Sequence, residues 1–178
     1  MKNTLFLIVS VFISYSTFAS EFALTSDSVA NGKPISKAFF TNQFGCSGEN
    51  KMPDLKWENA PENTKSFALS YFDLDAPTGS GFWHYTLFNI DGNIDHLAGG
   101  IDGGKLPKGS VQGRTDLGIP GFIGSCPQTG EIHRYQWKLT ALDVDKLDIG
   151  SDTTPQVLSL NLLAHSLGQA KLTVLAGR

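Results

Sequence analysis

The sequence predicts a predominantly β protein with long loops and one helix. Three short runs, 66–74, 82–90 and 133–142, are rich in aromatic and apolar residues and are bounded by Gly, Pro, Asn and Asp, which is typical of strands. Segment 96–131, between the last two runs, is dense in Gly and holds several Pro. We therefore expect long surface loops there, of the kind that carry binding residues on a rigid scaffold.

The helix candidate covers residues 155–167. Its evidence is a repeat of apolar residues at helical spacing, formed by Leu160, Leu163 and Leu167. Gly168 follows directly and predicts the end of the helix, because glycine commonly terminates helices. Residues 170–175 are again apolar in character and predict a final strand.

The N-terminal segment predicts export. Residues 1–19 combine an early lysine, an apolar run from Leu5 to Ile13 and a small-residue exit at Ala19, which is the pattern of a secretory signal peptide. The apolar run is shorter than the roughly 20 residues that a membrane span needs. We therefore expect residues 20–178 to form a single domain of a periplasmic or secreted protein that does not insert stably into a membrane.

The charge of the chain excludes a general nucleic-acid binder. The sequence holds 14 Lys and Arg against 17 Asp and Glu. Loss of Lys2 with the signal peptide leaves 13 basic against 17 acidic residues, a net charge of −4, without a basic cluster. Proteins that bind nucleic-acid backbones show a basic stripe, so nucleic acid is not an expected partner.

The sequence contains two cysteines, Cys46 and Cys126, which are too far apart for a local redox or zinc motif. In an oxidising compartment two cysteines most simply form one disulfide. The alternative is a pair of free thiols.

Strand alternation brings ionisable residues to one end of the predicted sheet, because residues two apart on a strand share a face. One face of the first run then carries Tyr71, Asp73 and Asp75. One face of the second run carries His84, Thr86, Phe88 and Ile90, and one face of the third carries His133, Tyr135, Trp137 and Leu139. If the strands are neighbours, two carboxylates, two imidazoles and a phenol converge on one pocket. Arg134 alternates away from that pocket, and we expect it to pair with a carboxylate.

Three stretches together resemble one known family. They are "KSFALSYFDLDAPTGSGFWHYTLFNI", "LPKGSVQGRTDLG" and "GSCPQTGEIHRYQWKLTAL". In this order they are similar to the signatures of the phosphatidylethanolamine-binding proteins, also called Raf kinase inhibitor-like proteins, in the bacterial branch. The resemblance runs from residue 45 to residue 175, which is nearly the whole mature chain.

The resemblance implies a β-sandwich around a large antiparallel sheet, with a small pocket that accepts phosphate-type head groups. The residues that match the family's site motifs are Asp73, Asp75, Pro77, His84, Gly124, Ser125, His133 and Tyr135. Leu74 and Ser125 replace prolines of the family pattern, which affects loop rigidity and ligand preference. Glu131 replaces a small residue and is expected to narrow or acidify the mouth of the pocket.

The chemistry of these residues sets a condition on the ligand. Two aspartates repel a phosphate, so charged imidazoles, backbone N–H groups of the Gly-rich loop and the Tyr135 hydroxyl have to contact the anion. The aspartates then orient the imidazoles or accept from an ammonium group, which suits a zwitterion such as phosphoethanolamine. Binding is expected to weaken as pH rises through the imidazole range, and no cofactor is required.

Other interpretations remain open at this point. His84 and His133 are alternatively core histidines, and Asp73 and Asp75 turn formers before Pro77. A metal-dependent hydrolase that uses the Asp and His cluster is a second hypothesis, although no catalytic motif accompanies it. A third is a protein-interaction module, such as a regulator or inhibitor, that contacts a partner through loops 95–121 and carries a vestigial pocket. A homodimer is also compatible with the sequence.

Overall fold

The computed structural model describes residues 20–178, so the predicted signal peptide, residues 1–19, lies outside the described residues. The elements in chain order are β1 (Ala23–Thr25), the 3-10 helix η1 (Lys37–Phe39), β2 (Lys51–Met52), β3 (Leu55–Glu58), β4 (Ser66–Asp73), β5 (Phe82–Asp91), β6 (His96–Leu97), β7 (Gly100–Ile101), β8 (Val111–Gln112), β9 (Ile132–Leu142), α1 (Pro155–His165) and β10 (Ser166–Gly177). The predicted mainly β class is confirmed.

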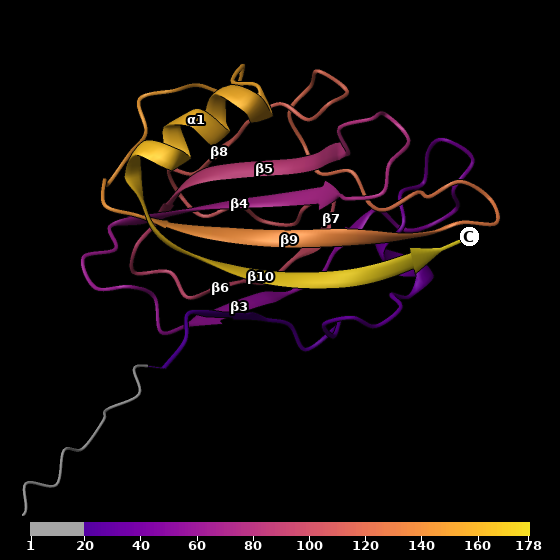
Figure 1. Ribbon diagram of the computed structural model, residues 1–178, viewed down its shortest axis with the longest axis horizontal. Coiled ribbons are helices and arrows are strands. Elements are labelled where there is room, and N and C mark those ends of the chain that lie inside the picture. The colour runs from indigo at the N-terminus through magenta and orange to yellow at the C-terminus, as the bar shows by residue number, and fades with distance from the viewer. Residues whose placement is uncertain (1–19) are drawn as a thin grey trace, which may run out of the picture.

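A five-stranded antiparallel sheet in the order β10-β9-β4-β5-β8 dominates the molecule. Two small sheets, β1-β3-β6 and β2-β7, complete the fold. Figure 1 shows α1 at the top of the view and β3 with β6 at the bottom, with the long strands between them. The predicted loop region 96–131 thus contributes three two-residue strands. Strand β6 pairs with β3, β7 with β2, and β8 with β5.

Two apolar clusters lie on opposite faces of the large sheet. The larger cluster joins β4, β5, β9 and β10 to the small sheets through residues such as Leu55, Trp57 and Leu97. The smaller cluster packs α1 against the sheet through Phe88, Leu158 and Leu162. Burial of both faces explains why β4 and β5 carry long apolar runs rather than strict alternation.

Two β-bulges in β5 change the predicted faces of that strand. The pairs Tyr71↔Tyr85 and Phe72↔Trp83 leave His84 as an extra residue, and a second register shift lies near Asn89, which has φ 57°. The prediction that His84, Thr86, Phe88 and Ile90 share one face is therefore wrong. Phe88 packs in the cluster under α1, whereas Ile90 packs in the large core.

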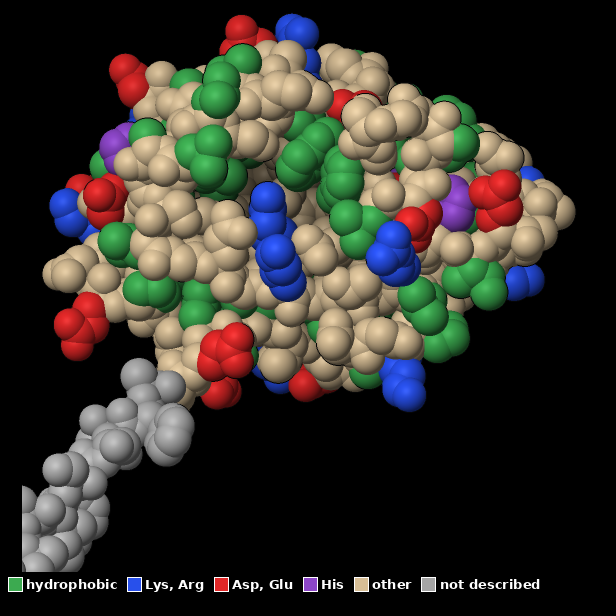
Figure 2. Space-filling view, viewed as in Figure 1, with side chains coloured by type: hydrophobic (Ala, Val, Ile, Leu, Met, Phe, Trp, Pro, Cys, Tyr) green, Lys and Arg blue, Asp and Glu red, His purple; other side chains and the backbone are tan. Residues whose placement is uncertain are grey.

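The helix differs from its prediction in its end and in its buried face. It ends at His165, and Gly168 lies inside β10 opposite Ala141 instead of capping the helix. Leu160 and Leu163 are 67% and 78% exposed. The core contacts are made by Leu158 and Leu162. Leucines recur at helical spacing on two faces of this helix, so their spacing alone does not identify the buried face. Figure 2 shows the hydrophobic side chains on the outer face of α1 at the upper left.

Cys46 and Cys126 form a disulfide across 80 residues of sequence, which confirms the paired alternative. The bond joins the loop before β2 to the loop before β9. Within residues 20–178, no helix has both the length and the apolar character to cross a membrane.

Candidate functional site

A cavity of about 270 Å³ opens where β4 ends, β5 begins and β9 begins. Its lining residues are Phe44, Asp73, Ala76, Pro77, Thr78, Phe82, His84, Leu117, Ile123, Cys126, Gln128 and His133. Four of the predicted site residues, Asp73, Pro77, His84 and His133, are in this set. The polar groups lie among mostly apolar walls, as in pockets that bind small organic ligands.

His133 lies between two carboxylates. Its Nδ1 is 2.8 Å from Oδ2 of Asp73, and its Nε2 is 2.8 Å from Oε2 of Glu131. An ionised carboxylate only accepts hydrogen bonds, so both contacts are made when both ring nitrogens carry protons. Burial alone would lower the pKa of His133, but the hydrogen bonds and charges of Asp73 and Glu131 outweigh it and raise the pKa above its ordinary value. Both contacts therefore favour the charged imidazolium form of His133.

His84 has the opposite electrostatic character. Burial lowers its pKa to about 4, against smaller raising effects of Asp73, Asp116 and the nearby backbone carbonyls. Its Nδ1 lies 3.2 Å from the carbonyl oxygen of Ile123, so Nδ1 carries the proton of the neutral ring and Nε2 is an acceptor. The two predicted cationic imidazoles thus differ, because burial disfavours the charged form of His84 whereas neighbouring carboxylates favour the charged form of His133.

The His84 ring is placed by the bulge in β5 and by the aromatic residues below it. Its centroid lies 5.8 Å from that of Tyr71 and 5.2 Å from that of Tyr135, and both contacts are edge-on. Tyr71 in turn stacks on Trp137 at 4.1 Å. The floor of the cavity thus rests on a layer of core aromatic rings, which leaves the histidine little rotational freedom.

Tyr135 is fully buried, and its hydroxyl accepts from the N–H of Cys126 at 3.2 Å. It supports the loop before β9 and is not among the residues that line the cavity, so the contact of its hydroxyl with an anion stays a prediction. Burial raises its pKa far above the ordinary value. The hydrogen bond between the Tyr135 hydroxyl and the N–H of Cys126 thus attaches this loop to β9.

Two of the backbone donors predicted in the Gly-rich loop are also occupied. The N–H of Gly124 donates to Oδ1 of Asn50 at 2.7 Å, and the N–H of Ser125 donates to the carbonyl of Phe39 at 3.2 Å. The Ser125 hydroxyl bonds the Tyr71 hydroxyl at 2.6 Å and is buried. Gly124 and Ser125 therefore fix the loop to the core, and the N–H groups of these two residues are occupied within the protein. Anion contact through the rest of the Gly-rich loop stays a prediction.

Asp75 lies outside the cavity. Beyond the end of β4 the chain turns, and Oδ1 and Oδ2 of Asp75 accept from the Arg134 guanidinium at 2.6 and 2.9 Å. These hydrogen bonds from Arg134 lower the pKa of Asp75 to about 2. The prediction that Asp75 shares the pocket face with Asp73 is wrong, because strand alternation ends with β4 at Asp73. The expectation that Arg134 pairs with a carboxylate is confirmed.

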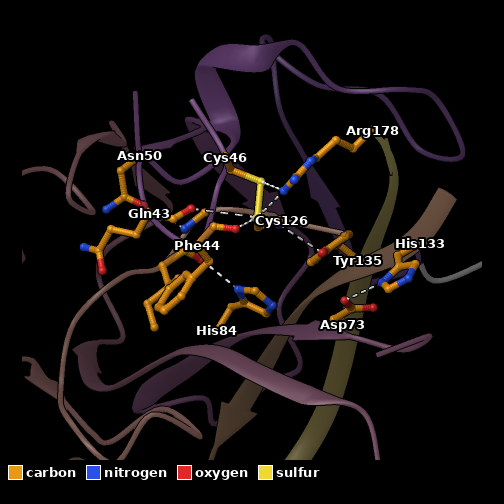
Figure 3. Close-up of a disulfide and its surroundings, with 12 residues drawn as sticks. Gln43, Phe44, Cys46, Asn50, Asp73, His84, Cys126, His133, Tyr135 and Arg178 are labelled. Carbon is orange, nitrogen blue, oxygen red and sulfur yellow. Dashed lines mark hydrogen bonds and ion pairs between the residues drawn. A yellow bond between two sulfur atoms is a disulfide. The ribbon is translucent and has the colours of Figure 1, made fainter. Parts of the chain in front are cut away.

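The disulfide forms one side of the site. Figure 3 shows the bond above His84 and Phe44, with Tyr135 beside it and Arg178 reaching it from the end of β10. Nη1 of Arg178 lies 3.2 Å from Sγ of Cys46 and 3.4 Å from Sγ of Cys126. Phe44 adopts φ 56° and is 60% exposed, so the disulfide-linked loop holds an aromatic ring at the rim.

Sequence reasoning missed the walls of the cavity. Phe44, Leu117, Ile123 and Gln128 come from irregular loops, where neither strand alternation nor helical spacing gives a signal. The sequence predicts acidity at the mouth from Glu131, and the structure places its carboxylate directly against Nε2 of His133.

The metal hypothesis gains no geometric support. Within residues 20–178, no group of three or more His, Cys, Asp or Glu side chains is arranged to hold a metal ion. Both nitrogens of His133 already contact carboxylates, and Nδ1 of His84 faces a carbonyl.

Comparison with known proteins agrees with the architecture. The family model described as phosphatidylethanolamine-binding protein matches residues 25–177. Two relatives from Escherichia coli K12 are YbcL, 41% identical over 97% of each chain, and YbhB, 35% identical over 85% of this chain and 98% of that protein.

Solved structures give the same result. The crystal structure of E. coli YbcL, described as a member of the mammalian PEBP family, superposes with a TM-score of 0.85 at 39% identity and covers 89% of this chain and 99% of that chain. A phosphatidylethanolamine-binding protein homologue from Chlamydia trachomatis reaches a TM-score of 0.76 at 27% identity, over 88% of this chain and 97% of that one.

Proposed function

Because the chain belongs to the phosphatidylethanolamine-binding protein family, we propose that it is an exported binding protein without enzymatic activity. Its ligand is a small phosphorylated or zwitterionic molecule of the head-group type, held in the cavity at the ends of β4, β5 and β9. Family membership supports the binding role, and the N-terminal segment of the sequence supports export to the periplasm or beyond.

The observation that carries the proposal is the imidazolium of His133 in the wall of the cavity. Asp73 holds Nδ1, so an incoming oxyanion has to contact Nε2, the nitrogen that the half-exposed Glu131 carboxylate occupies. His84 supplies an acceptor in the same cavity, which suits a ligand that brings a proton on phosphate or ammonium. A donor beside an acceptor recognises such a ligand better than it recognises a simple anion.

The apolar walls indicate that the ligand has an organic part beyond its charged group. Phe44 and Leu117 are 60% and 42% exposed at the mouth, and Phe82 and Ile123 line the interior. Contact with these side chains removes apolar surface from water and contributes roughly 25 cal/mol for each Å² buried.

An NMR titration of the mature, disulfide-bonded protein with phosphoethanolamine tests the proposal. We expect saturable shifts at His84 and His133, and none at His96 and His165, which lie on β6 and at the end of α1. A chelator should leave the shifts unchanged, whereas chelator-sensitive shifts would favour the metal hypothesis. No shift at His84 or His133 up to millimolar ligand contradicts the proposal.

One observation favours a second function, the binding of a protein partner through loops 95–121. Three large apolar residues in this region are exposed, Ile101 at 66%, Leu117 at 42% and Ile119 at 59%. We therefore also propose a regulatory or inhibitory contact there. Cross-linking in the native compartment tests this contact. The natural protein should capture a partner that the Ile119→Ser variant does not capture. An unchanged set of partners rules this surface out.

A further inference from the structure

The contact between Glu131 and His133 involves the nitrogen that the proposed ligand requires. Glu131 directly precedes β9, and His133, the second residue of that strand, lines the cavity. The carboxylate of Glu131 accepts from Nε2 of His133 at 2.8 Å. Asp73 holds the other ring nitrogen, so the imidazolium has no further N–H to offer.

The backbone of Glu131 is fixed while its side chain is half exposed. Its N–H donates to the carbonyl of Gln128 at 3.1 Å, and its carbonyl accepts from the N–H of Arg178 at 3.2 Å. The side chain is 49% exposed, against 4% for His133. The carboxylate can therefore turn out toward solvent by rotamer changes alone, without movement of the strand.

The charges of the cavity oppose a simple anion as long as Glu131 stays in place. Asp73 and Glu131 each contribute one negative charge, and His133 contributes one positive charge. His84 is neutral because burial lowers its pKa to about 4. An anion that approaches Nε2 thus meets a net negative charge and an occupied donor.

We propose that Glu131 is a specificity-determining residue, a built-in competitor that occupies the anion position on His133 and has to be displaced by the ligand. Displacement by inorganic phosphate leaves the carboxylate beside an anion without a cationic partner. Displacement by a zwitterion brings an ammonium group that the carboxylate can contact. Glu131 therefore selects ligands that pair a phosphate with a nearby cation, a refinement that rests on the proposed binding function.

Isothermal titration of the intact, disulfide-bonded protein with two probes tests this role. Glu131→Gln should bind inorganic phosphate about tenfold more tightly than the natural protein does, because the charged competitor is gone. The same variant should bind phosphoethanolamine with less than a threefold change, because it loses a competitor and an ammonium contact together. Glu131→Ala should show the same gain in phosphate affinity, which would exclude the introduced glutamine amide as its cause.

Glu62→Gln is the matched control, since it removes the same charge from an exposed loop. Glu62 precedes β4, and the neighbouring Pro61 lies beside Gly168, at the end of β10 far from the residue that pairs with His133. Its affinities for both probes should equal those of the natural protein. A parallel NMR titration of the ligand-free proteins should show a lower pKa of His133 in Glu131→Gln than in Glu62→Gln.

The outcomes separate this inference from the proposed function. Equal phosphate affinity in the natural protein and Glu131→Gln overturns the competitor role and leaves the binding function standing. An unchanged pKa of His133 overturns it as well. If neither probe binds any of the variants, the proposed function fails, and the inference fails with it.

Discussion

Asp73 and His133 form a buried ion pair at the base of the cavity. Oδ2 of Asp73 lies 2.8 Å from Nδ1 of His133, and each side chain is 4% exposed. The residues sit on adjacent strands, with Asp73 opposite Tyr135 in the β4-β9 register. Such a pair gives little net stability as a unit, but loss of Asp73 leaves only the half-exposed Glu131 to compensate the buried imidazolium.

Asp73→Asn should therefore destabilise the fold by about 3 kcal/mol in urea unfolding at pH 7. The isosteric change keeps the side-chain volume and removes the charge that holds the imidazolium. Asp75→Asn is the control, because its pair with Arg134 is more exposed, at 30% and 59%, and exposed pairs contribute about 1 kcal/mol or less. Equal losses in both variants would contradict the structural role of the buried pair.

Acid sensitivity of the fold should come from His84 between about pH 6.5 and pH 4. Its folded pKa, lowered by burial to about 4, lies below the unfolded value of 6.5. Stability is thus fully present above pH 6.5 and falls as pH drops, by up to about 3 kcal/mol. His84→Gln should flatten this part of the stability profile. A slope that persists in the variant would assign the effect to other groups.

Ligand affinity should persist at neutral pH and decline on the alkaline side. The carboxylates of Asp73 and Glu131 raise the pKa of His133, so its imidazolium loses the proton at higher pH than an ordinary histidine does. Its contribution to stability is fully present below pH 6.5 and is lost as pH rises through the folded pKa. Phosphate monoesters are mostly dianionic above pH 7, so calorimetry with phosphoethanolamine from pH 7 to 9 reports on the protein. A flat affinity in this range would mean that His133 does not bind the anion.

The strands were predictable from the sequence, whereas much of the site was not. Aromatic and apolar runs located β4, β5 and β9 to within about a residue, and alternation correctly placed His133 and Tyr135 on the core face. Alternation failed at His84, because a bulge adds a residue that no local pattern announces. It failed again at Asp75, which follows the last residue of β4.

Loop residues were beyond such patterns for a different reason. Phe44 reaches the cavity because the bond between Cys46 and Cys126 brings together loops that lie 80 residues apart. The N–H of Gly124 donates to Asn50, a residue with φ 52° that the sequence gives no reason to connect with Gly124. Contacts between residues so far apart in the sequence depend on the tertiary fold, so the periodicity of the sequence does not predict them.

The orientation of α1 can be tested by two substitutions on opposite faces. Leu158 is 3% exposed in the cluster under the helix, and Leu163 is 78% exposed. Leu158→Ala should cost about 3 kcal/mol through lost burial and a residual cavity. Leu163→Ala should change stability by about 0.5 kcal/mol or less. A larger loss of stability in Leu163→Ala than in Leu158→Ala, measured by thermal or urea unfolding, would support the buried face predicted from leucine spacing.

Reduction of the disulfide should weaken both the fold and the cavity. In the chain-entropy model, closure of a loop of 80 residues stabilises the fold by up to about 4 kcal/mol. The bond also ties the loop that carries Phe44 to the loop that carries Cys126, and both residues line the cavity. The double variant Cys46→Ala, Cys126→Ala should therefore unfold at lower urea and bind phosphoethanolamine more weakly, even under conditions in which it is fully folded. Because Asp73 and His133 lie on β4 and β9 outside the linked loops, their NMR signals in the free protein should change little. Loss of stability with unchanged affinity would show that the rim formed by Phe44 takes no part in binding.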